Sequence, residues 1–125
     1  MSEGARVLVV DDDPSVRRLI ALNLELDGFE VRTAEDGWAA LTEIRADPPD
    51  VITLDLSMPV LDGLGTAAWL RADEGLAGLP VVLISAVLTA EDLELAEKIG
   101  VNAVLTKPFE SADLVAAVRG ALGRR

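Results

Sequence analysis

The stretch VLVVDDDP, residues 7–14, sets four apolar residues directly before three aspartates and a proline. A short apolar run rich in valine is typical of a strand that is buried on both faces. Three adjacent carboxylates repel one another, and holding them charged beside a dry strand is costly unless a cation or water offsets the repulsion. The stretch therefore predicts a buried strand that ends at a cation site, where at least one carboxyl group has a raised pKa without metal.

Apolar, β-branched runs alternate with segments of helical period along the rest of the chain. Strands are predicted over residues 6–10, 29–33, 51–54, 81–84 and 103–105. Helices are predicted between Asp13 and Gly28, around Trp38 to Ile44, and over residues 64–71, 91–99 and 112–122. Five such βα units predict an α/β fold with a five-stranded, doubly wound parallel sheet, in a single domain spanning residues 1–125.

The first predicted helix has clear ends and one apolar face. Asp13 suits its N-cap, Pro14 suits its first turn, and Gly28 suits its stop. The apolar face, which we expect to be buried, carries Val16, Leu19, Ile20 and Leu24.

Composition limits the chemistry that the chain can perform. Its 125 residues include 22 acidic and 11 basic side chains, and the formal net charge of −11 opposes direct nucleic-acid binding by the domain as a whole. The chain has no cysteine and no histidine, which excludes disulfides, thiolate chemistry, histidine triads and a histidine phosphocarrier. The side chains that remain available for chemistry are carboxylates, hydroxyls and lysines.

Membrane and secretory signals are missing from the sequence. Its apolar runs are shorter than the roughly 18 residues of a membrane span. The first residues, MSEGAR, lack the basic and then apolar pattern of a secretory leader. We therefore expect a soluble, cytoplasmic protein without membrane contact.

Polar side chains follow four of the five predicted strands. They are Asp11, Asp12 and Asp13 after the first strand, Asp55 after the third, Ser85 after the fourth, and Thr106 with Lys107 after the fifth. A doubly wound sheet binds ligands at the carboxyl ends of its strands, near the switch in strand order. These side chains are therefore expected to meet at one edge of the sheet.

The chemistry of this group indicates a site for a hard divalent cation and a phosphoryl group. Asp11, Asp12 and Asp55 supply the oxygen ligands and the charge that Mg²⁺ prefers. Asp55 can attack a phosphoryl group as a nucleophile while the metal and Lys107 neutralise its oxygens, and the Ser85 hydroxyl can bind the transferred group.

Each of these features also has a structural explanation when it is taken alone. Aspartates before a helix often only cap it, and Asp13 is interpreted in this way. A strand-end aspartate such as Asp55 can bond to loop amides, a strand-end serine is usually structural, and Lys107 alone fits a solvated loop. Because all of these side chains follow strand ends on the same edge of the sheet, a site for a cation and a phosphoryl group is the favoured interpretation.

Four segments, in order, resemble the CheY-like receiver domain of two-component response regulators. They are VLVVDDDP (residues 7–14), DLSMPVLDG (55–63), ISA (84–86) and TKPF (106–109). The resemblance covers essentially the whole chain, and it implies a flavodoxin-like (βα)5 fold with strand order 2-1-3-4-5.

The resemblance also assigns roles to individual residues. It implies that Asp55 is the phosphoacceptor and that Asp11 and Asp12 bind Mg²⁺ together with Asp55 and the backbone carbonyl of Ser57. Ser85 and Lys107 would contact the phosphoryl group. In the family this lysine commonly precedes a cis proline, so the peptide bond between Lys107 and Pro108 is expected to be cis.

The function implied by the resemblance is phosphorylation-dependent signalling. A histidine kinase or a histidine phosphotransfer protein would donate a phosphoryl group to Asp55, and the altered conformation would signal to a downstream protein or output domain. The family also allows a homodimer. Relatives often turn an aromatic residue inward at the position held here by Val104. We therefore expect either that the output signal passes through loop and packing shifts centred on Ser85 and Val104, or that the coupling to output is weak.

Two other classes of protein remain as alternatives. A receiver-like module could bind proteins without phosphorylation, although none of the acidic or lysine positions is missing here. An aspartate-nucleophile phosphatase would also use Asp55 and Mg²⁺, but it normally needs a second acid where this chain has Ser57. A Mg²⁺-dependent response to a phosphoryl mimic tests the first alternative, and turnover of small phosphate esters tests the second.

Overall fold

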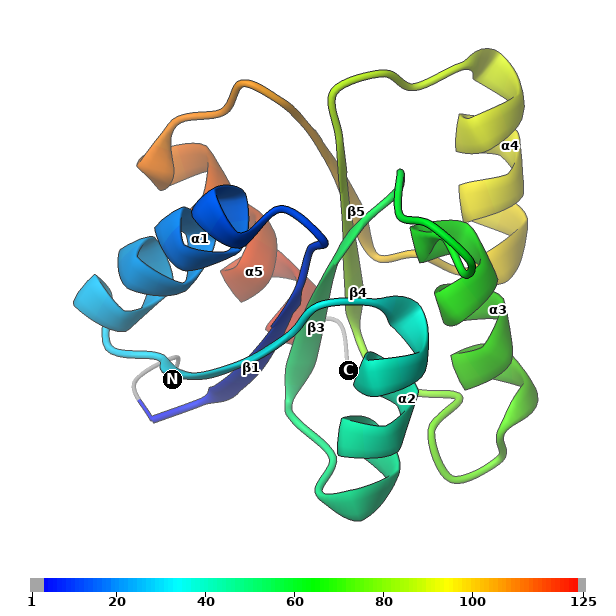
Figure 1. Ribbon diagram of the computed structural model, residues 1–125, viewed down its shortest axis with the longest axis horizontal. Helices are drawn as coiled ribbons and strands as arrows, with labels where there is room; N and C mark the ends of the chain where they lie inside the picture. Colours follow the sequence, from blue (N-terminus) through cyan, green and yellow to red (C-terminus); the bar gives the residue numbers. More distant parts are fainter. Residues whose placement is uncertain (1–3, 124–125) are drawn as a thin grey trace.

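Strands and helices alternate along the computed structural model, which describes residues 4–123 (Figure 1). The strands are β1 (Arg6–Val10), β2 (Glu30–Ala34), β3 (Val51–Asp55), β4 (Val81–Ser85) and β5 (Ala103–Thr106). The helices are α1 (Pro14–Leu26), α2 (Gly37–Ala46), α3 (Gly63–Ala72), α4 (Ala90–Ile99) and α5 (Ser111–Leu122). Every predicted element is present, with ends that differ from the prediction by a residue or two.

The strands form one parallel sheet in the order β2-β1-β3-β4-β5. Helices α1 and α5 lie on one side of it, and α2, α3 and α4 lie on the other (Figure 1). The chain reverses its direction of progress across the sheet at β1, which pairs with both β2 and β3. The predicted doubly wound, flavodoxin-like fold is confirmed.

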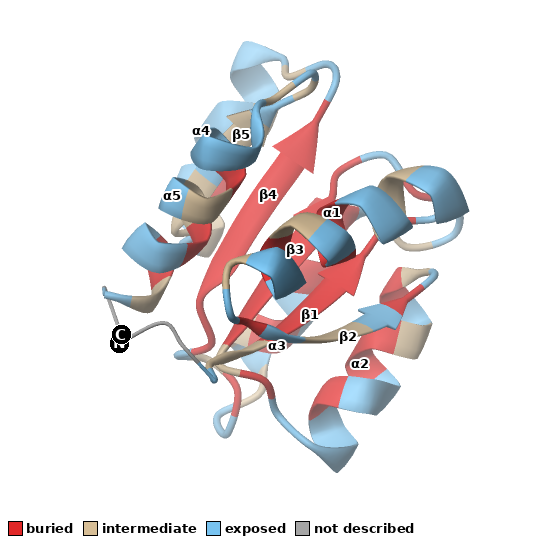
Figure 2. Ribbon diagram, turned by 90° about the vertical axis from the view of Figure 1, so that its left-hand side faces the viewer, coloured by how far each residue is buried: buried red, intermediate tan, exposed pale blue. Residues whose placement is uncertain are grey.

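The central strands are dry on both faces because helices cover the sheet from both sides. All residues of β3 and β4 are buried, whereas β2 and β5 lie at the edges and are partly exposed (Figure 2). Side chains alternate between faces with the period of a strand. Leu83 thus packs toward α2, α3 and α4, and its neighbours Val82 and Ile84 pack toward α1 and α5.

Helix α1 confirms its predicted caps but corrects one predicted core position. The Asp13 side chain accepts from the amides of Ser15 and Val16, and Gly28, with φ at 95°, follows the end of the helix. Ile20 and Leu24 are buried, but Leu19 is 53% exposed, so its prediction as a core residue was wrong. Leu19 lies about 100° around the helix from Ile20 and so falls outside the stripe of α1 that is covered.

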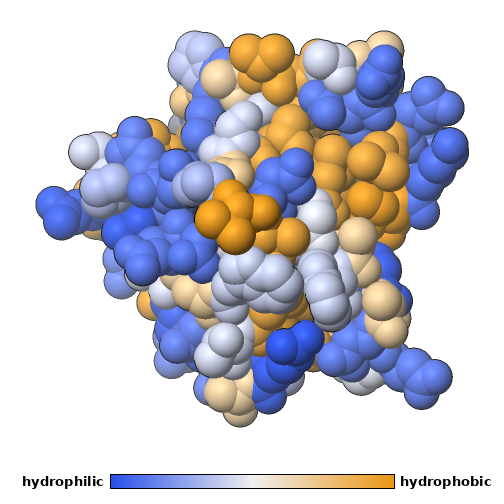
Figure 3. All heavy atoms as spheres, turned by 45° about the vertical axis from the view of Figure 1, so that its right-hand side comes forward, coloured by the Kyte–Doolittle hydropathy of each residue, from blue (hydrophilic) through white to orange (hydrophobic). Residues whose placement is uncertain are grey.

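The side of the molecule that carries α2, α3 and α4 keeps apolar side chains at its surface among charged ones (Figure 3). Trp38 from α2 and Trp69 from α3 are each about half exposed, and their rings meet edge to face with centroids 5.6 Å apart. The two rings therefore pack against each other at the surface. Within residues 4–123, no helix has the length and apolar composition of a membrane span.

Candidate functional site

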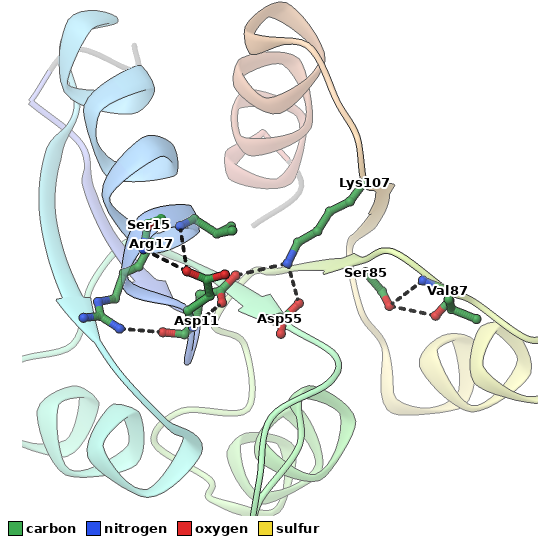
Figure 4. A network of polar contacts seen from close by, with 9 residues as sticks. Asp11, Ser15, Arg17, Asp55, Ser85, Val87 and Lys107 are labelled. Carbon is green, nitrogen blue, oxygen red and sulfur yellow. Dashed lines mark hydrogen bonds and ion pairs between the residues drawn. The ribbon is translucent and has the colours of Figure 1, made fainter.

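The carboxyl ends of β1, β3, β4 and β5 bring the predicted site residues to one edge of the sheet. Asp55 pairs with Ile84, and Ser85 pairs with Thr106, so these strands end nearly level. Asp11 follows β1, and Lys107 follows β5. In Figure 4 the side chains of Asp11, Asp55 and Lys107 point toward one another, as the strand-end pattern predicted.

Lys107 links two buried acids. Its Nζ donates to Asp55 Oδ1 at 2.9 Å and to Asp11 Oδ2 at 3.3 Å. Asp11 is only 1% exposed and Asp55 only 6% exposed, so the lysine is a counter-charge to carboxylates that have lost most of their hydration. The Lys107–Pro108 peptide bond is cis, as predicted.

The electrostatics of the site disfavour an ionised Asp55. Burial raises the pKa of the Asp55 carboxyl, the charges of Asp11 and Asp12 raise it further, and the hydrogen bond from Lys107 only partly opposes this. Burial would lower the pKa of Lys107, but its hydrogen bond to Asp55 and the nearby negative charges outweigh that effect and raise it. The largest cause of the raised pKa of Asp55 is thus burial, and the repulsion between carboxylates on which the sequence argument rested is a smaller one.

Three acids lie close enough together that they could share a cation. Ligand oxygens of Asp11, Asp12 and Asp55 all lie within 4.8 Å of one another. Hard carboxylate oxygens suit Mg²⁺, which usually keeps several waters, and Asp12 is exposed to solvent. Ser57 lies in the exposed loop after β3, and the role of its carbonyl stays a prediction.

Two close contacts involve main-chain carbonyls of the site residues, those of Asp55 and Asp11. Gly63 begins α3 against the carbonyl of Asp55, where an added Cβ would lie 2.5 Å from the oxygen, so this position requires glycine. Arg17, one turn into α1, donates from Nη1 to the main-chain carbonyl of Asp11 at 2.8 Å. Sequence reasoning did not single out Arg17; an arginine one turn after an acidic loop was the available signal.

Ser85 reaches the predicted edge of the sheet, but its hydroxyl is engaged elsewhere. Its Oγ donates to the carbonyl of Val87 at 2.7 Å and accepts from the Val87 amide at 3.2 Å. Figure 4 shows this side chain pointing toward Val87 and away from Asp55. Val104 on β5 pairs with Leu83 on β4 and is 37% exposed, so it lies outside the acidic cluster.

The order of the strands, the acidic cluster and the bridging lysine define a known class of domain. Residues 7–119 match the response regulator receiver domain family. The chain belongs to this family, which confirms the resemblance drawn from its four segments.

Curated relatives include longer transcriptional regulators. The chain is 44% identical over 120 residues to the transcriptional regulatory protein PrrA of Mycobacterium tuberculosis, covering 96% of this chain and 51% of PrrA. It is 39% identical over 119 residues to the DNA-binding response regulator MtrA of Mycolicibacterium smegmatis, covering 95% of this chain and 51% of MtrA. The chain thus spans about half the length of these relatives.

Solved structures of similar fold cover nearly the whole chain. The chemotaxis protein CheY4 of Vibrio cholerae superposes with a TM-score of 0.88 at 30% identity, covering 93% of this chain and 97% of CheY4. A response regulator from Chloroflexus aurantiacus superposes with a TM-score of 0.91 at 32% identity, covering 98% of this chain and all of that one. Both have the length of a single receiver domain.

Proposed function

We propose that residues 1–125 form one receiver domain that accepts a phosphoryl group on Asp55. The observation that carries this proposal is the buried Asp55 carboxylate, bonded to Lys107 inside a cluster of three acids. An Asp55 oxygen attacks phosphorus and forms an acyl phosphate while the bond between phosphorus and the donor breaks, and the leaving group keeps that electron pair.

The residues around Asp55 offset the charge that builds up on the transferred group. Asp11, Asp12, Asp55 and the Ser57 carbonyl would hold Mg²⁺, which supplies positive charge against the phosphoryl oxygens. The Lys107 ammonium supplies a second positive charge, since its raised pKa keeps it protonated at neutral pH. Lys107 also keeps Asp55 and Asp11 together before the reaction.

Ser85 connects phosphorylation to the output side of the molecule. To reach a phosphoryl oxygen on Asp55, the Ser85 side chain must turn away from Val87, which breaks the hydrogen bond that its hydroxyl donates and the one that it accepts. This releases the loop that leads into α4, and Val104 on β5 adjusts by packing because it has no aromatic ring to turn. The phosphoryl group therefore biases a two-state element formed by this loop and α4.

The proposed phosphodonor is a histidine kinase or a histidine phosphotransfer protein, since the chain itself has no histidine. An apolar stripe on α1 suits its docking: Leu19, Leu22 and Leu26 are 53%, 51% and 78% exposed. Helix α1 begins beside the acidic cluster, so a partner helix lying along this stripe places its histidine near Asp55. Contact between apolar side chains would supply the free energy of binding to this partner, since the net negative charge of the domain does not supply it.

We further propose that the domain acts as a stoichiometric phosphoacceptor in the cytoplasm, where it would meet such a kinase. Ser57 stands where an aspartate-nucleophile phosphatase would need a second acid, which argues against turnover of phosphate esters. The signal would pass to a downstream protein, an output domain or a second copy. The net charge of −11 argues against direct nucleic-acid contact by this domain.

Intact mass after incubation with acetyl phosphate tests the phosphoacceptor. We expect a single phosphoryl addition that requires Mg²⁺ and disappears in Asp55→Asn. The matched control is Asp13→Asn, which removes the same charge from the same edge while asparagine keeps the helix cap, and which should still be phosphorylated.

No addition to the wild-type protein, together with no binding of beryllofluoride, would favour the phosphorylation-independent binding module. Continuous release of phosphate in excess of protein would favour the phosphatase. Phosphorylation that persists in Asp55→Asn would move the acceptor to another side chain.

A further inference from the structure

The position of Asp12 depends on the two peptide groups that flank it. Its side chain is exposed, so burial does not hold it. On one side, the carbonyl of Asp11 accepts from Arg17 Nη1 at 2.8 Å; on the other, the amide of Asp13 donates to Asp11 Oδ1 at 2.9 Å (Figure 4). Together these two bonds set the direction in which Asp12 leaves the main chain.

A cation affects these two bonds differently. Asp11 Oδ1 accepts from Asp13, and Asp11 Oδ2 accepts from Lys107 at 3.3 Å, so a cation that binds the Asp11 carboxylate must share an oxygen with one of these donors. The carbonyl of Asp11 is a different atom. The bond from Arg17 can therefore persist when a cation occupies the carboxylates.

Arg17 is well placed to maintain its hydrogen bond to the Asp11 carbonyl. It is half-buried on the first turn of α1, where its amide donates to the carbonyl of Asp13 at 2.9 Å. The same residue thus bonds to the loop through its main chain and through its side chain. A guanidinium is planar and always charged, so it orients a carbonyl more firmly than a flexible ammonium does.

We propose that Arg17 is a positioning residue of the metal site. Arg17 holds the carbonyl of Asp11 and thereby orients the peptide group between Asp11 and Asp12. The carboxylates of these two residues then lie beside the carboxylate of Asp55. This inference rests on the proposed function, because it takes Mg²⁺ as the ligand of the acidic cluster.

The test compares Arg17→Met with Arg18→Met in the full chain. Both changes remove one positive charge and keep a long side chain of similar helix propensity, but Arg18 is the exposed neighbour on the same helix turn. Isothermal titration with Mg²⁺ should show about tenfold weaker binding for Arg17→Met, the lower end of the usual effect of losing a group that supports metal ligands. Arg18→Met should stay within about twofold of the wild type.

Two further readouts separate positioning from a general loss of structure. Arg17→Lys keeps one donor, so it should bind Mg²⁺ with intermediate affinity even where Arg17→Met folds poorly. With acetyl phosphate, Arg17→Lys should need more Mg²⁺ for half-maximal phosphorylation while its rate at saturating Mg²⁺ stays near that of the wild type.

The outcomes distinguish this inference from the function on which it rests. Equal Mg²⁺ affinity in Arg17→Met and Arg18→Met, with a wild type that binds the metal, overturns the role of Arg17 alone. Wild-type affinity in Arg17→Lys together with weak binding in both methionine variants overturns it too, because charge would then be the cause. A wild type that does not bind Mg²⁺ overturns both proposals.

Discussion

Asp55 is a buried carboxylate that faces two other acids and one lysine. Ionising it costs free energy because burial removes its hydration, and this cost exceeds what the Lys107 hydrogen bond returns. Any positive charge added near this carboxylate stabilises its ionised form. The residue that carries the proposed function is therefore also one that reduces the stability of the metal-free protein.

The raised pKa of Asp55 predicts how this cost depends on pH. Because the pKa is raised above 3.8 in the folded protein, the penalty is absent at lower pH and develops as the pH rises through the folded pKa. Urea unfolding without metal should show Asp55→Asn gaining stability relative to the wild type between about pH 3 and pH 7. A difference that stays constant or shrinks over this range contradicts the raised pKa.

Thr53 gives a second prediction at the residue scale. It is fully buried in β3, and its hydroxyl has no hydrogen-bond partner within the described part of the chain. Thr53→Val keeps the shape and removes the unpaired group, so the free energy of unfolding should rise by about 1 kcal/mol. Thr66→Val is the control, since that equally buried hydroxyl donates to the Asp62 carbonyl at 2.8 Å and its loss should be destabilising.

At the scale of elements, α4 is held to the rest of the fold mainly near its C-terminal end. Ala96 is its only buried residue among those described. Arg71, in the last turn of α3, donates from Nε and Nη2 to the carbonyls of Ile99 and Gly100, at 3.1 and 2.8 Å, and from Nη1 to Leu79 at 2.7 Å. One guanidinium thus joins the ends of two helices and the loop before β4.

Removing this link should loosen α4 before the rest of the fold. We expect Arg71→Met to lower the free energy of unfolding by about 2 kcal/mol, since main-chain carbonyls lose a charged donor. Amide exchange should speed up around Gly100 and Val101 more than in α2. Arg45→Met, in the last turn of α2, is the matched control, and a loss of equal size there would contradict a specific role for Arg71.

The apolar stripe on α1 leads to a prediction about the phosphodonor. Leu22→Arg should slow phosphotransfer from an autophosphorylated histidine kinase that serves the wild type by about tenfold, the effect of losing about 1.4 kcal/mol of contact. The acetyl phosphate reaction needs no docking and should be unchanged. Leu93→Arg makes the same substitution on α4 at similar exposure, and an equal slowing there would exclude α1 as the docking surface.

At the scale of the whole molecule, negative charge opposes the compact state. The net charge of −11 means that screening by salt should stabilise the fold modestly. Mg²⁺ should do more than screen, because three of the acids converge on one point.

Comparison of Mg²⁺ with NaCl at equal ionic strength separates the two effects. At about ten times its dissociation constant, Mg²⁺ should add about 1.4 kcal/mol of stability beyond the salt effect through mass action. Asp12→Asn should lose this extra gain and keep the response to NaCl. If NaCl stabilises the wild type as much as Mg²⁺ does, the acidic cluster is not a specific metal site.

The elements themselves were predictable from the chain, and so was the edge at which the acids meet. Valine-rich runs, helix caps such as Asp13 and stops such as Gly100 act over a few residues, so their effect can be read locally. The edge followed as well, because parallel strands end on the same side of a sheet. Asp11, Asp55 and Lys107 lie together for that reason.

Side-chain directions and long-range contacts depended on the packed structure. Leu19 is exposed because it lies about 100° around α1 from Ile20, outside the stripe that packs on the sheet. Ser85 turns toward Val87 because a loop amide and carbonyl lie within reach, which strand position alone does not reveal. The bonds of Arg71 depend on where distant helix ends come to rest. Local pattern therefore determined which chemistry is present and where it gathers, and tertiary packing decided how each group is held.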